Sequence, residues 1–240
     1  MAAYTAPGWY GKLPSTGDFL HHRLSEKQIS PWNHWFQQGL MHWHQQGLMH
    51  WHQQGNASTA AFLRAPVWNF VLPIAPGRQQ IQMGCLLPSC DRVGRAWPLL
   101  ALHSFSLNQW HPAQLTISGD WFQDLGSTLL QAVQMPLNAE QLEQRIQKLL
   151  PLLVPMKQQS DIMDVIGFQD LPCTLSWREV ADRFDPQQHI SYWWSNRSDG
   201  FAHATHKHSG NLTAQLFSLL FNPAAGAQPG RNGLYPPMFE

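Results

Sequence analysis

The sequence predicts an α+β domain, in which a mixed, largely antiparallel β-sheet carries helices on its faces. Three short apolar runs bounded by proline and glycine follow one another at 67–74, 80–87 and 98–105. Two segments with helical spacing of apolar residues come next, at 120–135 and 138–150. Two further strand-like segments and a last helix complete the order strands, helices, strands, helix. Strands and helices that are segregated along the chain are typical of α+β domains.

The first 105 residues are expected to form four strands and one helix. Gly8–Leu13 reads as a short strand, which the turn-forming residues 15–18 end. Ser30 before Pro31 is typical of a helix start, because the hydroxyl caps the first turn and proline has no N–H to leave unsatisfied. The three apolar runs should pair antiparallel, since the links between them are too short to hold a crossover helix.

The second half of the chain begins with helices. The 120–135 segment places its apolar residues at helical spacing, and Pro136 ends it. Asn138 and Gln141 resemble a capping box that opens the next helix, through Leu150. The remaining elements follow as a strand at 190–194, a turn at 196–200, a strand at 201–206 and a helix at 212–221.

Composition indicates one domain with a substantial core. The 240 residues are 43% apolar and include twelve tryptophans, and no linker divides them. We therefore expect a single domain over 1–222 and a flexible tail rich in proline and glycine over 223–240. Charged residues make up only 12%, fifteen of each sign. This balance gives no pull toward nucleic acid, and a weakly charged surface favours a protein partner.

The sequence contains no recognisable secretory signal or membrane span. The N-terminus lacks the basic and apolar regions of a secretory signal, and no run approaches the roughly 18 apolar residues of a membrane span. Three cysteines, Cys85, Cys90 and Cys173, follow no metal or disulfide pattern. We expect a reduced, cytoplasmic protein that does not span a membrane.

Residues 34–55 state one eight-residue unit almost three times, as HWFQQGLM, HWHQQGLM and HWHQQG. No two of its histidines are three or four residues apart, so a helix would offer no adjacent metal ligands. On a helix the unit advances about 800°, which places successive tryptophans roughly 80° apart and forms no seam. We interpret the repeat as a tandem duplication and an insertion, and expect an extended or looped-out segment.

His203, His206 and His208 are the remaining metal candidates. On a strand His206 and His208 share one face and His203 lies on the other, and no nearby acid or cysteine completes a ligand set. The common catalytic motifs are absent, so we expect no catalytic residue, no cofactor and no enzyme. The alternative is a metal-dependent enzyme that uses these histidines, with an acid from 161–170. A third reading takes the aromatic excess as a sugar or peptide groove.

Four blocks follow one another along the chain: GWYGKLPSTGDFL at 8–20, PWNHWFQQGL at 31–40, MGCLLPSCDRVGRAWPL at 83–99 and SYWW at 191–194. Together they resemble the TagF family of proteins associated with bacterial type VI secretion. Asn33 and Phe36 stand where the family usually has aspartate and leucine. The resemblance implies helices on both faces of the sheet, in a longin- or profilin-like three-layer arrangement. It also implies a cytoplasmic, post-translational repressor of type VI secretion that binds the forkhead-associated scaffold protein Fha.

We consider two interpretations of the loops in the first and third family blocks. In the first, the loops of the first and third blocks lie together and present charges to a partner: Lys12, Asp18, Asp91, Arg92 and Arg95. In the second, the loops are architectural. Gly11 and Gly17 would permit tight backbone geometry, Asp18 would accept backbone N–H groups, and Asp91 would form a charge network with Arg92 and Arg95. The residues to which we assign a structural role are Gly8, Trp9, Gly11, Pro14, Gly17, Pro31, Trp32, Pro88, Gly94, Trp193 and Trp194.

Overall fold

A seven-stranded antiparallel sheet forms the centre of the computed structural model, which describes residues 6–54, 62–75, 79–153, 155, 173–197, 202–221, 228–230 and 233–235. The strand order is β2-β1-β5-β4-β3-β6-β7. Its strands are β1 (Gly8–Gly11), β2 (Leu20–His22), β3 (Trp68–Leu72), β4 (Ile81–Leu87), β5 (Leu99–Phe105), β6 (Ile190–Asn196) and β7 (Ala202–Ser209). Every neighbouring pair is antiparallel, which confirms the predicted pairing.

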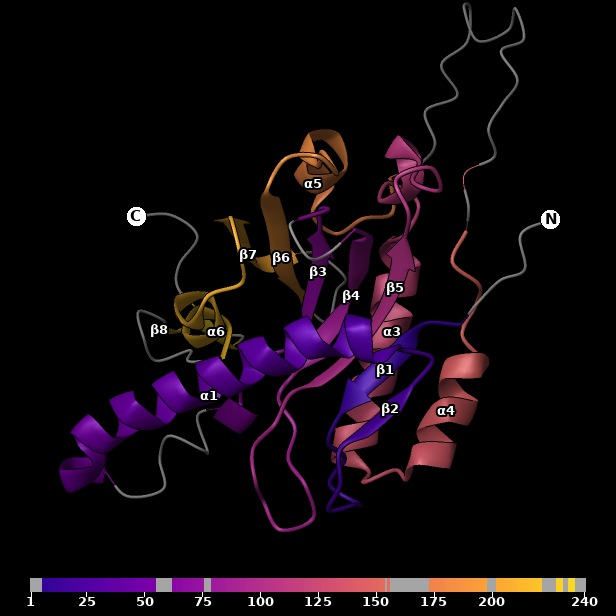
Figure 1. The fold of residues 1–240 in the computed structure, drawn as a ribbon. Coiled ribbons are helices and arrows are strands. Elements are labelled where there is room, and N and C mark those ends of the chain that lie inside the picture. The colour runs from indigo at the N-terminus through magenta and orange to yellow at the C-terminus, as the bar shows by residue number, and fades with distance from the viewer. Residues whose placement is uncertain are drawn as a thin grey trace, which may run out of the picture.

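Helices cover both faces of this sheet (Figure 1). One face packs against α1 (Glu26–Gln54) and α6 (Ala214–Phe221). The other packs against α3 (Gly119–Gln134), α4 (Ala139–Gln147) and the short α5 (Arg178–Arg183), and a 3₁₀ turn, η1 (Pro112–Gln114), precedes α3. Two hydrophobic cores result, one on each side of the sheet. The predicted α+β class with helices on both faces is therefore confirmed.

The central strands β3 and β4 are buried at every position because both of their faces are covered. In β3, Phe70 and Leu72 point to the core under α1 and α6, whereas Val71 points to the core under α3. In β6, Trp193 and Trp194 divide between the two cores in the same way. This two-sided burial explains why the central runs show little alternation in the sequence.

Helix α1 begins at Glu26, five residues before the predicted start at Pro31. Ser25 precedes it, and the Gln28 side chain accepts hydrogen bonds from both the Ser25 backbone N–H (3.0 Å) and its hydroxyl (2.9 Å). Pro31 therefore lies inside the helix, where proline removes one backbone hydrogen bond. The burial of Trp32 and Trp35, directly after it, offsets that loss.

The tandem repeat is helical, so the expectation of an extended or looped-out segment is wrong. Helix α1 continues through it to Gln54 and runs on past α6 in Figure 1. Trp35 of the first copy is buried, and its indole N–H donates to the Thr213 carbonyl at 2.8 Å. Trp43 of the second copy packs edge-on against Phe62, with ring centroids 6.1 Å apart. The repeat is thus continuous with the core at its N-terminal end, while its origin as an insertion stays a prediction.

Some short elements were not expected from the sequence. Strand β2 and helix α5 are two of them, and a third is the hairpin of β8 (Gln228–Gly230) and β9 (Gly233–Tyr235) inside the predicted tail. The rest of that tail and the acidic stretch at 161–170 lie outside the described residues. In the described ranges, no helix combines the length and apolar character that crossing a membrane requires.

Candidate functional site

The β1–β2 loop and the β4–β5 loop lie side by side at one end of the sheet. Their strands leave from the same level, because Gly11 of β1 and Leu87 of β4 both pair with Leu99 of β5. The loops also bond to each other directly: the Arg92 backbone N–H donates to the Thr16 carbonyl at 2.8 Å. In Figure 1 both loops are at the lower end of the sheet. The predicted juxtaposition of the two loops is confirmed.

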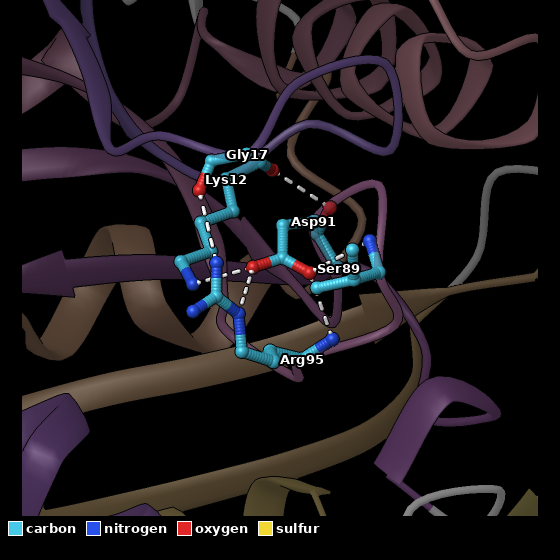
Figure 2. Close-up of polar contacts among 6 residues, drawn as sticks. Lys12, Gly17, Ser89, Asp91 and Arg95 are labelled. Carbon is cyan, nitrogen blue, oxygen red and sulfur yellow. Dashed lines mark hydrogen bonds and ion pairs between the residues drawn. The ribbon is translucent and has the colours of Figure 1, made fainter.

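Asp91 is the centre of the contacts between the loops (Figure 2). Its Oδ2 accepts from Lys12 Nζ at 2.8 Å and from Arg95 Nε at 2.6 Å. Its Oδ1 accepts from the backbone N–H groups of Val93 (3.1 Å) and Arg95 (2.9 Å). We call Lys12, Asp91 and Arg95 the Asp91 clasp. The clasp ties the β4–β5 loop to Lys12, the first residue of the β1–β2 loop.

Two of the three charges of the clasp, those of Lys12 and Asp91, are removed from water. Asp91 is 1% exposed and Lys12 is 6% exposed. Burial acts to raise the pKa of Asp91, but the hydrogen bonds from Lys12 and Arg95 outweigh it and hold this pKa well below its ordinary value. The carboxylate is therefore ionised at neutral pH, and each of its oxygens is satisfied by two donors.

The five predicted charges divide into internal and surface residues. Lys12 and Asp91 are buried, so neither is presented to a partner as expected; they hold the backbone of the two loops in place instead. Arg92 and Asp18 are exposed, and the Arg95 side chain is 65% exposed although it binds Asp91. Arg92 forms no ion pair with the described residues. The charge network around Asp91 therefore consists of Arg95, as expected, and of Lys12 instead of Arg92. Nor does Asp18 accept the predicted turn hydrogen bond from any described residue.

Several of the residues to which a structural role was assigned are buried or have a constrained backbone. Gly11 has φ 147°, and a Cβ there would overlap the Pro98 carbonyl. Gly94 has φ 82°, the left-handed conformation that glycine adopts without strain. Gly17 is different: its φ is not positive and nothing lies within 4 Å of a Cβ built on it, so tight geometry does not explain it. The residues of that set that are buried are Gly8, Trp9, Gly11, Trp32, Pro88, Trp193 and Trp194.

Two exposed apolar side chains at this surface escaped the sequence reasoning. Phe19 follows the β1–β2 turn and is 50% exposed. Val93 lies at the tip of the β4–β5 loop and is 69% exposed. The Phe19 ring contacts the edge of Trp97 with centroids 4.7 Å apart, and Lys12 Nζ lies 4.6 Å from its centre. Their signal in the sequence was position alone: each stands next to a charged residue of a family block.

The histidine candidates do not assemble into a metal site. His206 packs against Trp68, with ring centroids 5.3 Å apart, and His208 Nε2 lies 2.7 Å from the Asn211 carbonyl oxygen. His203 Nδ1 accepts a hydrogen bond from Arg197 Nε at 3.4 Å, at the point where the β6–β7 pairing is irregular. Burial lowers the pKa of His203 and of His206. In the part of the chain that the structure describes, no three histidine, cysteine or acidic side chains come together as metal ligands.

The tryptophan excess builds the cores. Of the tryptophans whose side chains are described, all but Trp110 and Trp177 are buried, and those two are half-buried. Trp32 donates to Gln82 Oε1 at 3.1 Å, and Trp68 donates to the Leu220 carbonyl at 2.8 Å. A sugar groove needs exposed aromatic faces, and the described tryptophans do not supply them.

Comparisons with known proteins agree with this fold. Among solved structures, the crystal structure of PA0076 from Pseudomonas aeruginosa PAO1 is similar, with a TM-score of 0.65 and 24% sequence identity. The match covers 95% of this chain and 99% of that one, and it shows a shared fold. The chain matches no functionally curated protein. Residues 8–149 match the family model described as the TagF N-terminal domain, type VI secretion system-associated. Since this match spans more than half of its length, the chain belongs to the TagF family.

Proposed function

We propose that this protein is a cytoplasmic, post-translational repressor of type VI secretion, which binds the scaffold protein Fha and catalyses no reaction. Its family supports an association with type VI secretion. The observation that carries the proposal is the two-loop surface, where the exposed Arg92, Arg95 and Asp18 stand on a backbone fixed by the Asp91 clasp. Arginine is among the residues that contribute most to binding energy at protein interfaces.

A fixed surface suits recognition by contact. Binding costs free energy when loops and side chains must be ordered, and that cost falls when they are ordered beforehand. Here Asp91 holds the backbone N–H groups of Val93 and Arg95, and Ser89 Oγ donates to the Lys12 carbonyl at 2.8 Å. Both loops are thus held in place in the unbound protein. Repression would then follow from sequestering the scaffold and would need no turnover.

Co-purification with Fha from the same bacterium tests the proposal. Wild type should retain the scaffold, whereas Arg92→Glu and the double variant Arg92→Glu/Arg95→Glu should lose it. Arg92→Glu is the cleaner variant, because Arg95 also belongs to the clasp. Arg178→Glu provides the matched control: Arg178 is exposed on α5, toward the opposite end of the sheet in Figure 1, and should behave as wild type.

The outcomes separate the partner from the surface. If wild type does not retain Fha, the proposed partner is wrong. If wild type retains it and Arg92→Glu does so equally well, the partner is right and the surface is wrong. The conclusion about the surface requires that Arg92→Glu and Arg178→Glu have the melting temperature of wild type.

A further inference from the structure

The exposed Phe19 ring is held by contacts with buried residues. Single exposed hydrophobic residues are common on protein surfaces and need no explanation. The Phe19 ring, however, rests on Trp97 and lies 4.6 Å from Lys12 Nζ. Trp97 is itself buried and packs edge-on against Phe36 of the core, with centroids 5.9 Å apart. The exposed ring is therefore continuous with the core aromatics.

Val93 is held in place by Asp91, the ion-pair partner of Lys12. Its backbone N–H donates to Asp91 Oδ1, and Gly94 directly after it adopts the left-handed turn conformation at φ 82°. Lys12, the ion-pair partner of Asp91, is also the cation next to the Phe19 ring. One buried ion pair thus positions both exposed apolar side chains, although they stand on different loops.

The exposed charge around these two side chains is basic. Lys12 and Asp91 neutralise each other inside the protein, and the charges left at the surface are Arg92, Arg95 and Asp18. Complementary charge across an interface fixes register and suppresses wrong partners. A partner for this surface therefore combines an apolar contact area with acidic side chains around it.

We propose that Phe19 is the apolar anchor of the two-loop surface, with Val93 as its second contact. The partner surface it fits is a protein pocket that admits a phenyl ring and carries carboxylates at its rim, which meet Arg92 and Arg95. For the identity of that partner the inference rests on the proposed function. Central aromatic anchors of this kind contribute a large share of the binding energy of protein interfaces.

Titration with purified Fha scaffold tests the anchor. Phe19→Ala should weaken the dissociation constant at least about tenfold, as expected for a central aromatic anchor. Phe19→Tyr keeps the ring and should restore most of the affinity. Met41→Ala removes another exposed apolar side chain, 61% exposed on α1, and should bind as wild type. Raising the salt concentration should weaken wild type and Phe19→Ala by the same factor, because the arginines remain, and should affect Arg92→Glu less.

The results distinguish this inference from the proposed function. Weak binding by folded Phe19→Ala, with Met41→Ala unchanged, supports the anchor. If Phe19→Ala binds as wild type while Arg92→Glu does not, the anchor is wrong and the proposed function stands. If wild type itself does not bind the scaffold, both fall. Should Phe19→Ala fold poorly, Val93→Ser decides: weakened binding supports the inference, and unchanged binding overturns it.

Discussion

Asp91 and Lys12 are 79 positions apart in the sequence, and their contact shows what a single residue contributes to this surface. The family block around Asp91 marked it as important, and Lys12 was marked by another block. Nothing in the sequence indicated that the two charges neutralise each other in the interior. Burial depends on what packs around a residue, so the sequence predicted that the two loops lie together and not which of their charged residues are exposed.

Replacing Asp91 by asparagine should lower the free energy of unfolding by about 3–5 kcal/mol, because it leaves the Lys12 ammonium buried without its counter-charge. Urea denaturation at pH 7 measures this change. Asp18→Asn is the matched control, since Asp18 is exposed and forms no hydrogen bond with the described residues. Its effect should stay within about 0.5 kcal/mol. Equal stability of the two variants would show that the clasp does not stabilise the fold.

The depressed pKa of Asp91 also predicts how stability depends on pH. An aspartate in the unfolded chain has a pKa of about 3.9, and that of Asp91 in the folded protein is well below this value. As the pH falls below about 5, the unfolded state binds the proton first, so the stability contributed above that pH is progressively lost.

Wild type should therefore lose stability more steeply than Asp91→Asn between pH 5 and pH 3, as urea titrations at several pH values would measure. Glu143 also has a depressed pKa, because Arg23 and Trp9 outweigh its burial, and it contributes equally to both proteins. Parallel pH profiles of the two proteins would count against an ionised, buried Asp91.

Among the secondary-structure elements, the starts of α4 and α1 are both marked by capping residues in the sequence. The capping box of α4 is present as predicted, with the Gln141 backbone N–H donating to Asn138 Oδ1 at 2.8 Å. The same signature, Ser25 followed by Gln28, begins α1, but the Ser30–Pro31 pair was the more conspicuous start and the prediction followed it.

Strand β2 and helix α5 had no such local signal. Strand β2 has three residues, and its position depends on contacts with distant parts of the chain. It pairs with β1, and the adjoining Arg23 forms an ion pair with Glu143 of α4. Elements this short are stabilised by packing and pairing more than by their own propensity, so single-sequence patterns do not reveal them.

The contact between α1 and α6 gives a prediction that uses the repeat as its own control. A Cβ at Gly39 would overlap the ring of Phe217, a fully buried residue of α6. Gly39→Ala should therefore destabilise the protein by about 1–3 kcal/mol, the usual cost of overpacking. Gly47 is the equivalent residue of the next copy and lies eight positions further along the same helix. Gly47→Ala should instead stabilise by up to about 1 kcal/mol through helix propensity.

Thermal unfolding of the two variants measures the difference. Opposite shifts in melting temperature would show that close packing of the helices requires glycine in the first copy only. If both variants shift in the same direction, the approach of α6 to α1 at Gly39 is not the constraint.

For the whole molecule, the central sheet separates two cores, and helix α1 belongs to only one of them. Residues of the first repeat copy fill that core together with Trp43, whereas the two-loop surface lies at one end of the sheet. The fold class was predictable because runs of buried strand and amphipathic helix leave a periodic trace. The length of α1 was not predictable, because the repeat has no hydrophobic seam of its own. Its helix continues from the N-terminal half of α1, which is packed in the core.

Deletion of residues 42–49 tests whether the protein tolerates losing one repeat unit. The deletion joins Met41 to the third copy, so Trp51 takes the place of Trp43 within the same local sequence, HWHQQG. Helix α1 becomes shorter by eight residues, about 12 Å, and keeps Trp35 and Gly39 against α6. We expect a melting temperature within a few degrees of wild type and unchanged retention of Fha, because the two-loop surface is untouched.

Scanning calorimetry and co-purification check both expectations, with Gly39→Ala as the destabilised reference. Unfolding of the deletion variant would show that the full length of α1 is part of the fold, and loss of Fha from a folded variant would move the partner surface toward α1.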